Sequence, residues 1–189
     1  GNPELAKYWT KHNATILKSI GVNINFAPVA DVGSCDTRSF SDDAQTVANF
    51  VDAAAQGYEE ENFLYTLKHF PGIGKGKTNT HIEVSNVEDS KEILDAVDIF
   101  PFKKIIGAHD NSKFMIMVGH LKYPALDPVN SASLSPAVIT KLLRNELGYS
   151  GVVITDDLEM GAIANNVELS SLGVKIIQAG GDIALVCHN

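Results

Sequence analysis

Apolar residues recur along this chain in two patterns that alternate from one end to the other. In the longer segments they return every three or four positions, as on one face of a helix, and in the shorter segments they follow one another almost without a break. The first pattern predicts helices over residues 3–20, 43–61, 90–107, 135–147 and about 168–179. The second pattern predicts strands over residues 22–29, 63–70, 113–120, 151–155 and 182–186. The third helix is expected to be interrupted near Pro101, because proline has no amide hydrogen for the helical ladder.

Strands that are apolar on both faces indicate a sheet that is covered on both sides. Parallel sheets have this property because the helices that connect their strands pack on the two faces. Since predicted strands and helices alternate along the whole sequence, we expect an α/β fold with a parallel sheet. The chain has no low-complexity segment or long linker, so residues 1–189 are expected to form a single domain.

Polar side chains with useful chemistry stand where the predicted strands end. Asp31 follows the first strand, and Lys68 and His69 close the second. His120 closes the third strand, and Asp156 follows the fourth. In parallel α/β folds the C-terminal ends of the strands meet on one face, and catalytic groups gather there. A single histidine at a strand end is more often structural than catalytic, but four successive strand ends of this kind indicate a functional site.

Composition narrows the range of partners. Hydrophobic residues make up 44% and charged residues 20% of the chain, as in ordinary globular proteins, and the net charge is −8. A nucleic acid or an anionic membrane would require a clustered basic face, so neither is expected as a partner. No apolar run approaches the length of a membrane span, and residues 1–4 show no signal-peptide pattern. Cys35 and Cys187 lack metal-ligand spacing.

A glycine-rich loop follows the second strand and ends at His81. Glycine lets a backbone approach another group closely, so such a loop suits an active site as well as an ordinary surface turn. Residues 72–78 resemble a phosphate-binding loop only superficially. The spacing Gly-x-x-x-x-Gly-Lys-Ser/Thr is not met, and the sequence Asn-Thr-His follows at 79–81 in place of a helix.

Two kinds of chemistry remain open for these residues. His69, His81, His120 and the aspartates at 31 and 156 are usable metal ligands, but no His-x-x-x-His or Cys-x-x-Cys spacing supports a metal site. A carboxylate nucleophile on one strand, with a histidine acid/base on a pliable loop, fits better. That arrangement needs no cofactor and uses each group in its ordinary protonation state.

Six motifs run through the sequence. The longer three are KHFPG at 68–72, MVGHLKYPALD at 117–127 and GVVITDDLEMG at 151–161. The shorter three are FAPVADV at 26–32, RSF at 38–40 and AGGD at 179–182. Together they resemble the family 3 glycoside hydrolases, in the branch of bacterial β-N-acetylglucosaminidases (β-hexosaminidases) that act in cell-wall recycling and turnover. The resemblance covers essentially the whole chain.

The resemblance implies a (β/α)8 fold of the TIM-barrel type. Such barrels need about 250 residues. The 189 residues are therefore expected to form an incomplete barrel of about five β/α units, the central and C-terminal part of the catalytic barrel. The parts expected to be missing are the first two strand–helix units and the last strand.

The resemblance also implies a retaining hydrolase that removes terminal β-linked N-acetylglucosamine from peptidoglycan-derived or chitin-like saccharides. Asp156 matches the nucleophile that forms a covalent glycosyl-enzyme, and His81 matches the general acid/base. An imidazole suits the second role, because an ordinary pKa of about 6.5 lets it give and take a proton near neutral pH. No metal or other cofactor is implied. Asp157 is expected to be structural, because neighbouring strand residues point to opposite sides.

The remaining site residues are matched to substrate binding. Lys68 and His69 match ligands of sugar hydroxyls, and Arg38 matches an arginine that holds the substrate. His120 and Met160 match positions that line the pocket. The implied partner is a carbohydrate. The compartment, cytoplasm or cell envelope of a bacterium, stays open, and so does the oligomeric state.

The chain departs from the family pattern in the glycine-rich loop. The family usually has an aspartate two residues before the catalytic histidine, where this chain has Asn79, and a histidine where Ile73 stands. An amide can accept a hydrogen bond from the ring, but it cannot stabilise an imidazolium as a carboxylate does. Two alternatives therefore stay open. One is a β-glucosidase or glycoside phosphorylase of the same family, and the other is a catalytically weakened sugar-binding remnant.

Overall fold

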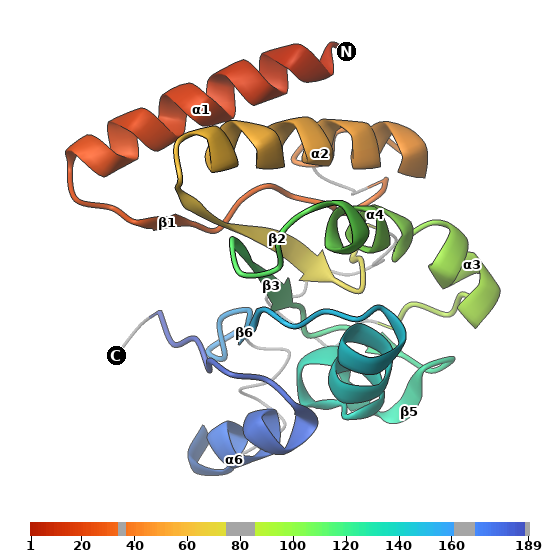
Figure 1. The fold of residues 1–189 in the computed structure, drawn as a ribbon. Helices are drawn as coiled ribbons and strands as arrows, with labels where there is room; N and C mark the ends of the chain where they lie inside the picture. Colours follow the sequence, from red (N-terminus) through yellow and green to blue (C-terminus); the bar gives the residue numbers. More distant parts are fainter. Residues whose placement is uncertain (34–36, 75–85, 161–168, 188–189) are drawn as a thin grey trace.

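The computed structural model describes residues 1–33, 37–74, 86–160 and 169–187 (Figure 1). Its centre is a parallel sheet made of β1 (Ile24–Asn25), β2 (Leu64–Phe70), β3 (Phe114–Val118) and β6 (Val152–Thr155). The strands lie side by side in the order in which they occur in the chain. A doubly wound sheet would reverse its strand order, whereas a β/α barrel does not. The predicted parallel α/β fold is confirmed, with the strand order of an incomplete barrel.

Helices connect the strands, and α2 packs against the sheet (Figure 1). They are α1 (Pro3–Ser19), α2 (Ala44–Glu60), α3 (Lys91–Ala96), α4 (Phe100–Ala108), the π-type helix η2 (Ala137–Glu146) and α6 (Leu169–Ala179). All five predicted helical segments are present, the third as the pair α3 and α4. Pro101 lies in the first turn of α4, where its missing amide hydrogen has no helical partner to lose. The predicted interruption therefore falls just before this residue.

The first strand is shorter than the sequence predicts. Regular pairing is limited to β1, and beyond it the chain continues beside β2 through an isolated bridge between Val29 and Lys68. Pro28 lies just before that bridge and cannot donate a backbone hydrogen bond, so a continuous ladder cannot run through it. The segment still reaches the end of β2, and Asp31 follows directly after it.

The prediction of a strand over residues 182–186 is wrong. Only Ile183 pairs with the sheet, through an isolated bridge to Ile154. The carboxylate of Asp182 accepts the backbone N–H of Val153 at 2.7 Å, which takes the place of a ladder bond.

A hairpin that the sequence analysis did not predict follows β3. It consists of β4 (Lys122–Tyr123) and β5 (Asp127–Ser131), paired antiparallel, and the 3₁₀ turn η1 (Ala132–Leu134) follows it. Its strands are short, and Asp127 turns its carboxylate back onto the following backbone. Neither feature produces the long apolar run from which strands were predicted.

A row of stacked aromatic rings forms part of the core on the helix-covered side of the sheet. Tyr58 of α2 stacks on Tyr65 of β2 and Tyr65 on Phe114 of β3, with ring centroids 5.5 and 5.4 Å apart, and Tyr149 packs against Phe114 with tilted rings at 5.3 Å. All four side chains are buried. Tyr65 and Phe114 lie near the N-terminal ends of their strands. This apolar packing thus stabilises one end of the sheet and leaves the opposite end to polar residues.

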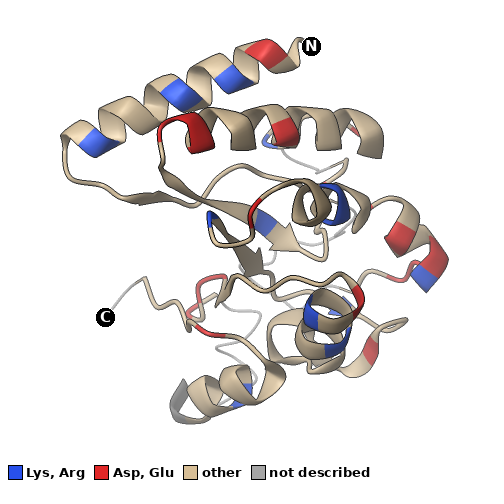
Figure 2. Ribbon diagram, viewed as in Figure 1, with Lys and Arg blue, Asp and Glu red and all other residues tan. Residues whose placement is uncertain are grey.

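The helix α1 lies outside α2 (Figure 1). Lys7 and Lys11 of α1 both pair with Glu60 of α2, at 2.7 and 2.8 Å, and Figure 2 shows how these charges line the two helices. The other face of α1 is apolar and exposed, and includes Tyr8 and Trp9. None of the helices in the described ranges combines the length and the hydrophobicity that a bilayer crossing requires.

We expect Asp127 to stabilise the fold in a pH-dependent way. Burial raises the pKa of its carboxyl, but the Ser135 hydroxyl and the N–H groups of Val129 and Asn130 outweigh burial and hold the pKa at about 2. Because this value lies below that of an unfolded aspartate, the stabilisation is present above pH ~4 and is lost as the pH falls towards 2. Asp127→Asn should lower the free energy of unfolding by about 1–2 kcal/mol at pH 7. Urea unfolding at pH 7, 5 and 3 measures this effect.

The matched control is Asp110→Asn. Asp110 accepts from the N–H and hydroxyl of Ser112 in a similar turn, but it is exposed, so its replacement should change stability much less. A stability difference between wild type and Asp127→Asn that stays the same from pH 7 to pH 3 would contradict the assignment.

Candidate active site

The register of the sheet brings the predicted site residues to one edge. Lys68 of β2 pairs with Met117 of β3, and Met117 pairs with Ile154 of β6. One step further along, the N–H of Asp156 donates to the carbonyl of Val118 at 2.9 Å. The C-terminal ends of β2, β3 and β6 therefore lie at one level.

Asp31 and His69 form the most buried ionisable pair of this edge. The Oδ2 atom of Asp31 lies 2.8 Å from Nδ1 of His69, and the two side chains are 2% and 5% exposed. The Oδ1 atom accepts the backbone N–H of His69 at 3.1 Å and that of Ile73 at 2.9 Å. One carboxylate thus holds a histidine ring and the start of the loop that follows β2.

Asp156 is the accessible carboxylate of the site. Its side chain is 23% exposed, and its Oδ2 atom lies 3.8 Å from Nε2 of His69. The other oxygen, Oδ1, accepts the backbone N–H of Asp157 at 2.9 Å. A distance of 3.8 Å exceeds a hydrogen bond, so Oδ2 is held near the imidazole but is not bonded to it. This oxygen is free to meet a ligand.

Lys68 contributes a cation next to this carboxylate. Burial lowers the pKa of its ammonium group, whereas the charge of Asp156 raises it. Arg38, which is exposed, lies close enough to lower the pKa of Lys68 further. Lys68 therefore places a hydrogen-bond donor near Asp156, and Nε2 of His69 lies beside the same carboxylate, so the site offers polar groups of the kind that a hydroxyl-rich ligand requires.

His120 lies behind the turn that follows β6. Its Nε2 atom donates to the carbonyl of Asp157 at 2.9 Å, and because that nitrogen carries the proton, Nδ1 accepts from the Ser133 hydroxyl at 2.9 Å. Burial lowers the pKa of His120, which favours the neutral ring. Both nitrogens are bonded to protein atoms, so the ring supports the segment that carries Asp156.

The other predicted residues differ in how they relate to this cluster. Asp157 accepts the backbone N–H groups of Glu159 and Cys187 at 3.1 and 3.2 Å, which fits the structural role expected of it. Met160 follows in the same turn, and its N–H donates to the carbonyl of Asp157 at 3.1 Å. His81 and Asn79 lie outside the described residues.

Sequence reasoning missed several groups that hold the site together. Asp31 was recognised as a strand-end residue, but nothing in the sequence identifies His69 as its partner. The Tyr123 hydroxyl donates to the carbonyl of Gly72 at 2.7 Å and so fixes the turn after β2. Ser133 belongs to the unpredicted segment after the hairpin. Of these groups, the sequence could indicate only Asp31, through its position at a strand end.

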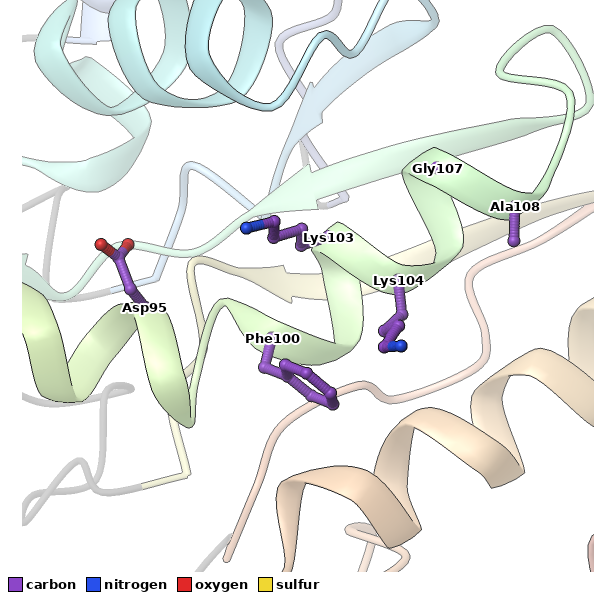
Figure 3. Close-up of a pocket in the computed structure, with 6 residues that line it drawn as sticks. All are labelled: Asp95, Phe100, Lys103, Lys104, Gly107 and Ala108. Carbon is purple, nitrogen blue, oxygen red and sulfur yellow. The ribbon is translucent and has the colours of Figure 1, made fainter.

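A separate cavity lies on the outside of the fold. It has a volume of about 550 Å³ and lies along α4, lined by Asp95, Phe100, Lys103, Lys104, Gly107 and Ala108 (Figure 3). The Lys104 ammonium lies 5.4 Å from the centre of the Phe100 ring. None of the predicted site residues lines this cavity. In the described ranges, no group of three or more His, Cys, Asp or Glu side chains is arranged to hold a metal ion.

Comparisons with known proteins agree on one family. A family model described as "Glycosyl hydrolase family 3 N terminal domain" matches residues 1–189. The β-hexosaminidase A of Pseudoalteromonas piscicida is 37% identical over 187 residues, which cover 90% of this chain and 31% of that protein. The β-hexosaminidase of Stenotrophomonas maltophilia strain K279a is 35% identical over 179 residues, which cover 93% of this chain and 52% of that protein.

Solved structures give the same result. A glycoside hydrolase family 3 β-N-acetylglucosaminidase from Paenibacillus sp. str. FPU-7 superposes with a TM-score of 0.95 at 35% identity, over 100% of this chain and 37% of that one. The β-N-acetylglucosaminidase from Thermotoga maritima gives a TM-score of 0.90 at 32% identity, over 98% and 40%. The chain thus spans from 31% to 52% of the length of these relatives.

Gly119 provides a test of the packing beneath the site. A Cβ atom at this position would lie 3.2 Å from Cγ2 of Ile73 and 3.4 Å from Cβ of His69. Gly119→Ala should therefore displace both neighbours by a few tenths of an ångström and cost about 1–3 kcal/mol of stability. Thermal unfolding and a crystal structure of the variant measure the two effects.

Gly107→Ala is the control for this substitution. Gly107 lies in α4, and a Cβ atom there would meet nothing within 4 Å, so alanine should raise stability by up to about 1 kcal/mol. If Gly119→Ala were as stable as wild type, with His69 unmoved, the close packing of Gly119 against Ile73 and Cβ of His69 would be refuted.

Proposed function

The chain belongs to glycosyl hydrolase family 3, and from this premise we propose that it carries the nucleophile of a retaining β-N-acetylglucosaminidase. The substrate is a terminal β-linked N-acetylglucosamine of a peptidoglycan-derived or chitin-like saccharide. The relatives' names, β-hexosaminidase and β-N-acetylglucosaminidase, support this substrate class. We further propose that the chain is the central and C-terminal part of the catalytic barrel.

The observation that supports the proposal is the environment of the Asp156 carboxylate. One of its oxygens is held by a backbone N–H, and the other is accessible, 3.8 Å from His69 Nε2 and close to Lys68. A nucleophilic carboxylate needs such a fixed orientation and one oxygen that can reach the reacting carbon. None of the other strand-end carboxylates in the described residues offers this, because Asp31 is buried and fully engaged.

In the proposed reaction, the glycosidic bond is hydrolysed in two displacements. In the first, Oδ2 of Asp156 forms a bond to the anomeric carbon while the glycosidic C–O bond breaks, and the departing oxygen takes a proton from the His81 imidazolium. In the second, water attacks the anomeric carbon, His81 takes a proton from it, and the ester bond to Asp156 breaks. Both displacements invert the carbon, so the configuration is retained overall.

The remaining residues bind and hold the sugar. Lys68 and His69 are assigned to hydroxyl groups, because both lie at the strand end beside Asp156, where Lys68 offers a donor and the His69 ring a nitrogen that can bond to a hydroxyl. Arg38 and Met160 are assigned to the pocket wall. His120 is assigned a supporting role at that wall, since its ring bonds to Asp157 and Ser133.

Replacing the nucleophile tests the proposal. Asp156→Asn should lower kcat on an aryl N-acetyl-β-glucosaminide by at least about 10³-fold, because an amide cannot form the glycosyl ester. A fluorinated N-acetylglucosaminyl donor should label the wild type at Asp156, and mass spectrometry of the digested protein locates the label.

Asp157→Asn is the matched control, since the Asp157 carboxylate accepts the backbone N–H groups of Glu159 and Cys187 and its loss should leave kcat within about tenfold. A label on another residue, or an Asp156→Asn variant with wild-type activity, would refute the proposal. Turnover that rises steeply when phosphate is added would favour a phosphorylase of the same family.

A second candidate function rests on Asn79, which stands where the family has an aspartate. In that case the chain retains sugar binding but has a weakened acid/base. Asn79→Asp should then raise kcat by at least about tenfold, because a carboxylate stabilises the imidazolium of His81. Steady-state kinetics of wild type, Asn79→Asp and Asn79→Ala measures this. If the aspartate variant gains nothing over the alanine variant, Asn79 does not limit the reaction.

A further inference from the structure

Asp31 is buried, and its carboxylate is bonded to the end of β2 and to the turn that follows it. Oδ2 lies 2.8 Å from Nδ1 of His69, and Oδ1 accepts the backbone N–H groups of His69 and Ile73 at 3.1 and 2.9 Å. The Asp31 backbone is fixed as well, because its carbonyl accepts the Ser39 hydroxyl at 2.6 Å. Asp31 therefore joins three segments that meet at the strand ends.

The direction of the bond to the ring follows from the chemistry of the two groups. A carboxylate has no proton to donate, so Nδ1 of His69 must carry the proton. The atom that remains on the side of Asp156 is Nε2, 3.8 Å from Oδ2. With its proton on Nδ1, the neutral ring presents Nε2 as a hydrogen-bond acceptor, which can take the proton of a sugar hydroxyl placed next to Asp156.

We propose that Asp31 is a positioning residue for the glycosidase reaction: it fixes the tautomer and the orientation of His69, so that Nε2 faces the site beside the nucleophile Asp156 as an acceptor for one hydroxyl of the sugar. This inference rests on the proposed function. It adds a role for a residue that makes no contact with the open side of the site, since Asp31 is 1% exposed.

A merely structural role for Asp31 can be separated from this one. Two of its bonds end on backbone N–H groups and anchor the loop, and one ends on the ring. In Asp31→Asn, the amide oxygen can keep the two backbone bonds, but the NH₂ group then faces Nδ1 and can only donate. The fold is retained, while His69 must move its proton to Nε2 or turn its ring.

Kinetics and NMR together test the proposal in the protein expressed from its complete gene. Asp31→Asn should lower kcat/KM by on the order of 10²-fold or more with little change in melting temperature. In a His69→Gln background, where the ring is absent, the same substitution should change kcat/KM by less than about threefold. Long-range ¹H–¹⁵N spectra of ¹⁵N-histidine protein, with the His69 signals assigned from His69→Gln, should show the proton on Nδ1 in wild type and on Nε2 in Asp31→Asn.

Asp127→Asn is the control, because Asp127 is also a carboxylate that accepts backbone N–H groups, but its side-chain partners are Asn130 and Ser135 and not a histidine. It should lower stability and leave the His69 signals and kcat/KM within about threefold of wild type. The proposal is overturned if Asp31→Asn costs as much in the His69→Gln background as in wild type. It is also overturned if the His69 proton stays on Nδ1 in the Asp31→Asn variant.

The two proposals can fail separately. If the wild-type protein does not hydrolyse N-acetylglucosaminides, the proposed function fails, but the NMR comparison still decides whether Asp31 sets the state of His69. If the wild type is active and the NMR comparison shows no exchange of the proton, the function stands and the role of Asp31 is refuted.

Discussion

Parallel pairing of neighbouring strands is the constraint on which the site depends. Each strand pairs with the next one in the chain, and the ladder from Lys68 through Met117 to Ile154 fixes their relative positions along the sheet. A shift of one residue would turn every side chain of a strand to the other face. Because the register is fixed, residues that are far apart in sequence end at one level, and the carboxylate of Asp156 meets the ring of His69.

Buried polar groups at this edge are bonded in ways that leave little freedom. Asp31 uses both oxygens on His69 and Ile73, and His120 uses both nitrogens on Ser133 and Asp157. Leaving such groups unpaired would be costly in a buried site. The consequence is a rigid framework from which one accessible oxygen, that of Asp156, faces outwards.

A second histidine that is bonded to carboxylates lies elsewhere in the fold. His109, which follows α4, lies 2.8 Å from Asp52 and 2.9 Å from Glu59, both on α2. This histidine is also held by carboxylates, but it joins the C-terminal end of α4 to α2 and does not join two strand ends. Sequence reasoning selected His69 and not His109 because only the former closes an apolar run.

Much of the fold was accessible from the sequence because apolar runs and helical spacing reflect burial directly. The body of β2 and the helix α2 were predicted to within a residue or two of their observed bounds. Where pairing depends on single residues, as with Pro28 in the first strand and Asp182 after α6, the same patterns predicted strands that are too long or absent. The strand ends indicated which residues meet, but not that Asp31 binds His69, because a side-chain hydrogen bond across 38 residues leaves no periodic trace.

The outer helix α1 has a consequence for how this protein can be observed in solution. Trp9, the single tryptophan of the chain, lies on the exposed face of α1, and α2 separates α1 from the sheet (Figure 1). Its intrinsic fluorescence will therefore respond to solvent or to anything that covers that helix. A saccharide that binds at the strand ends should not change the fluorescence of Trp9. Measuring its binding by fluorescence therefore requires a second fluorophore near the C-terminal ends of the strands.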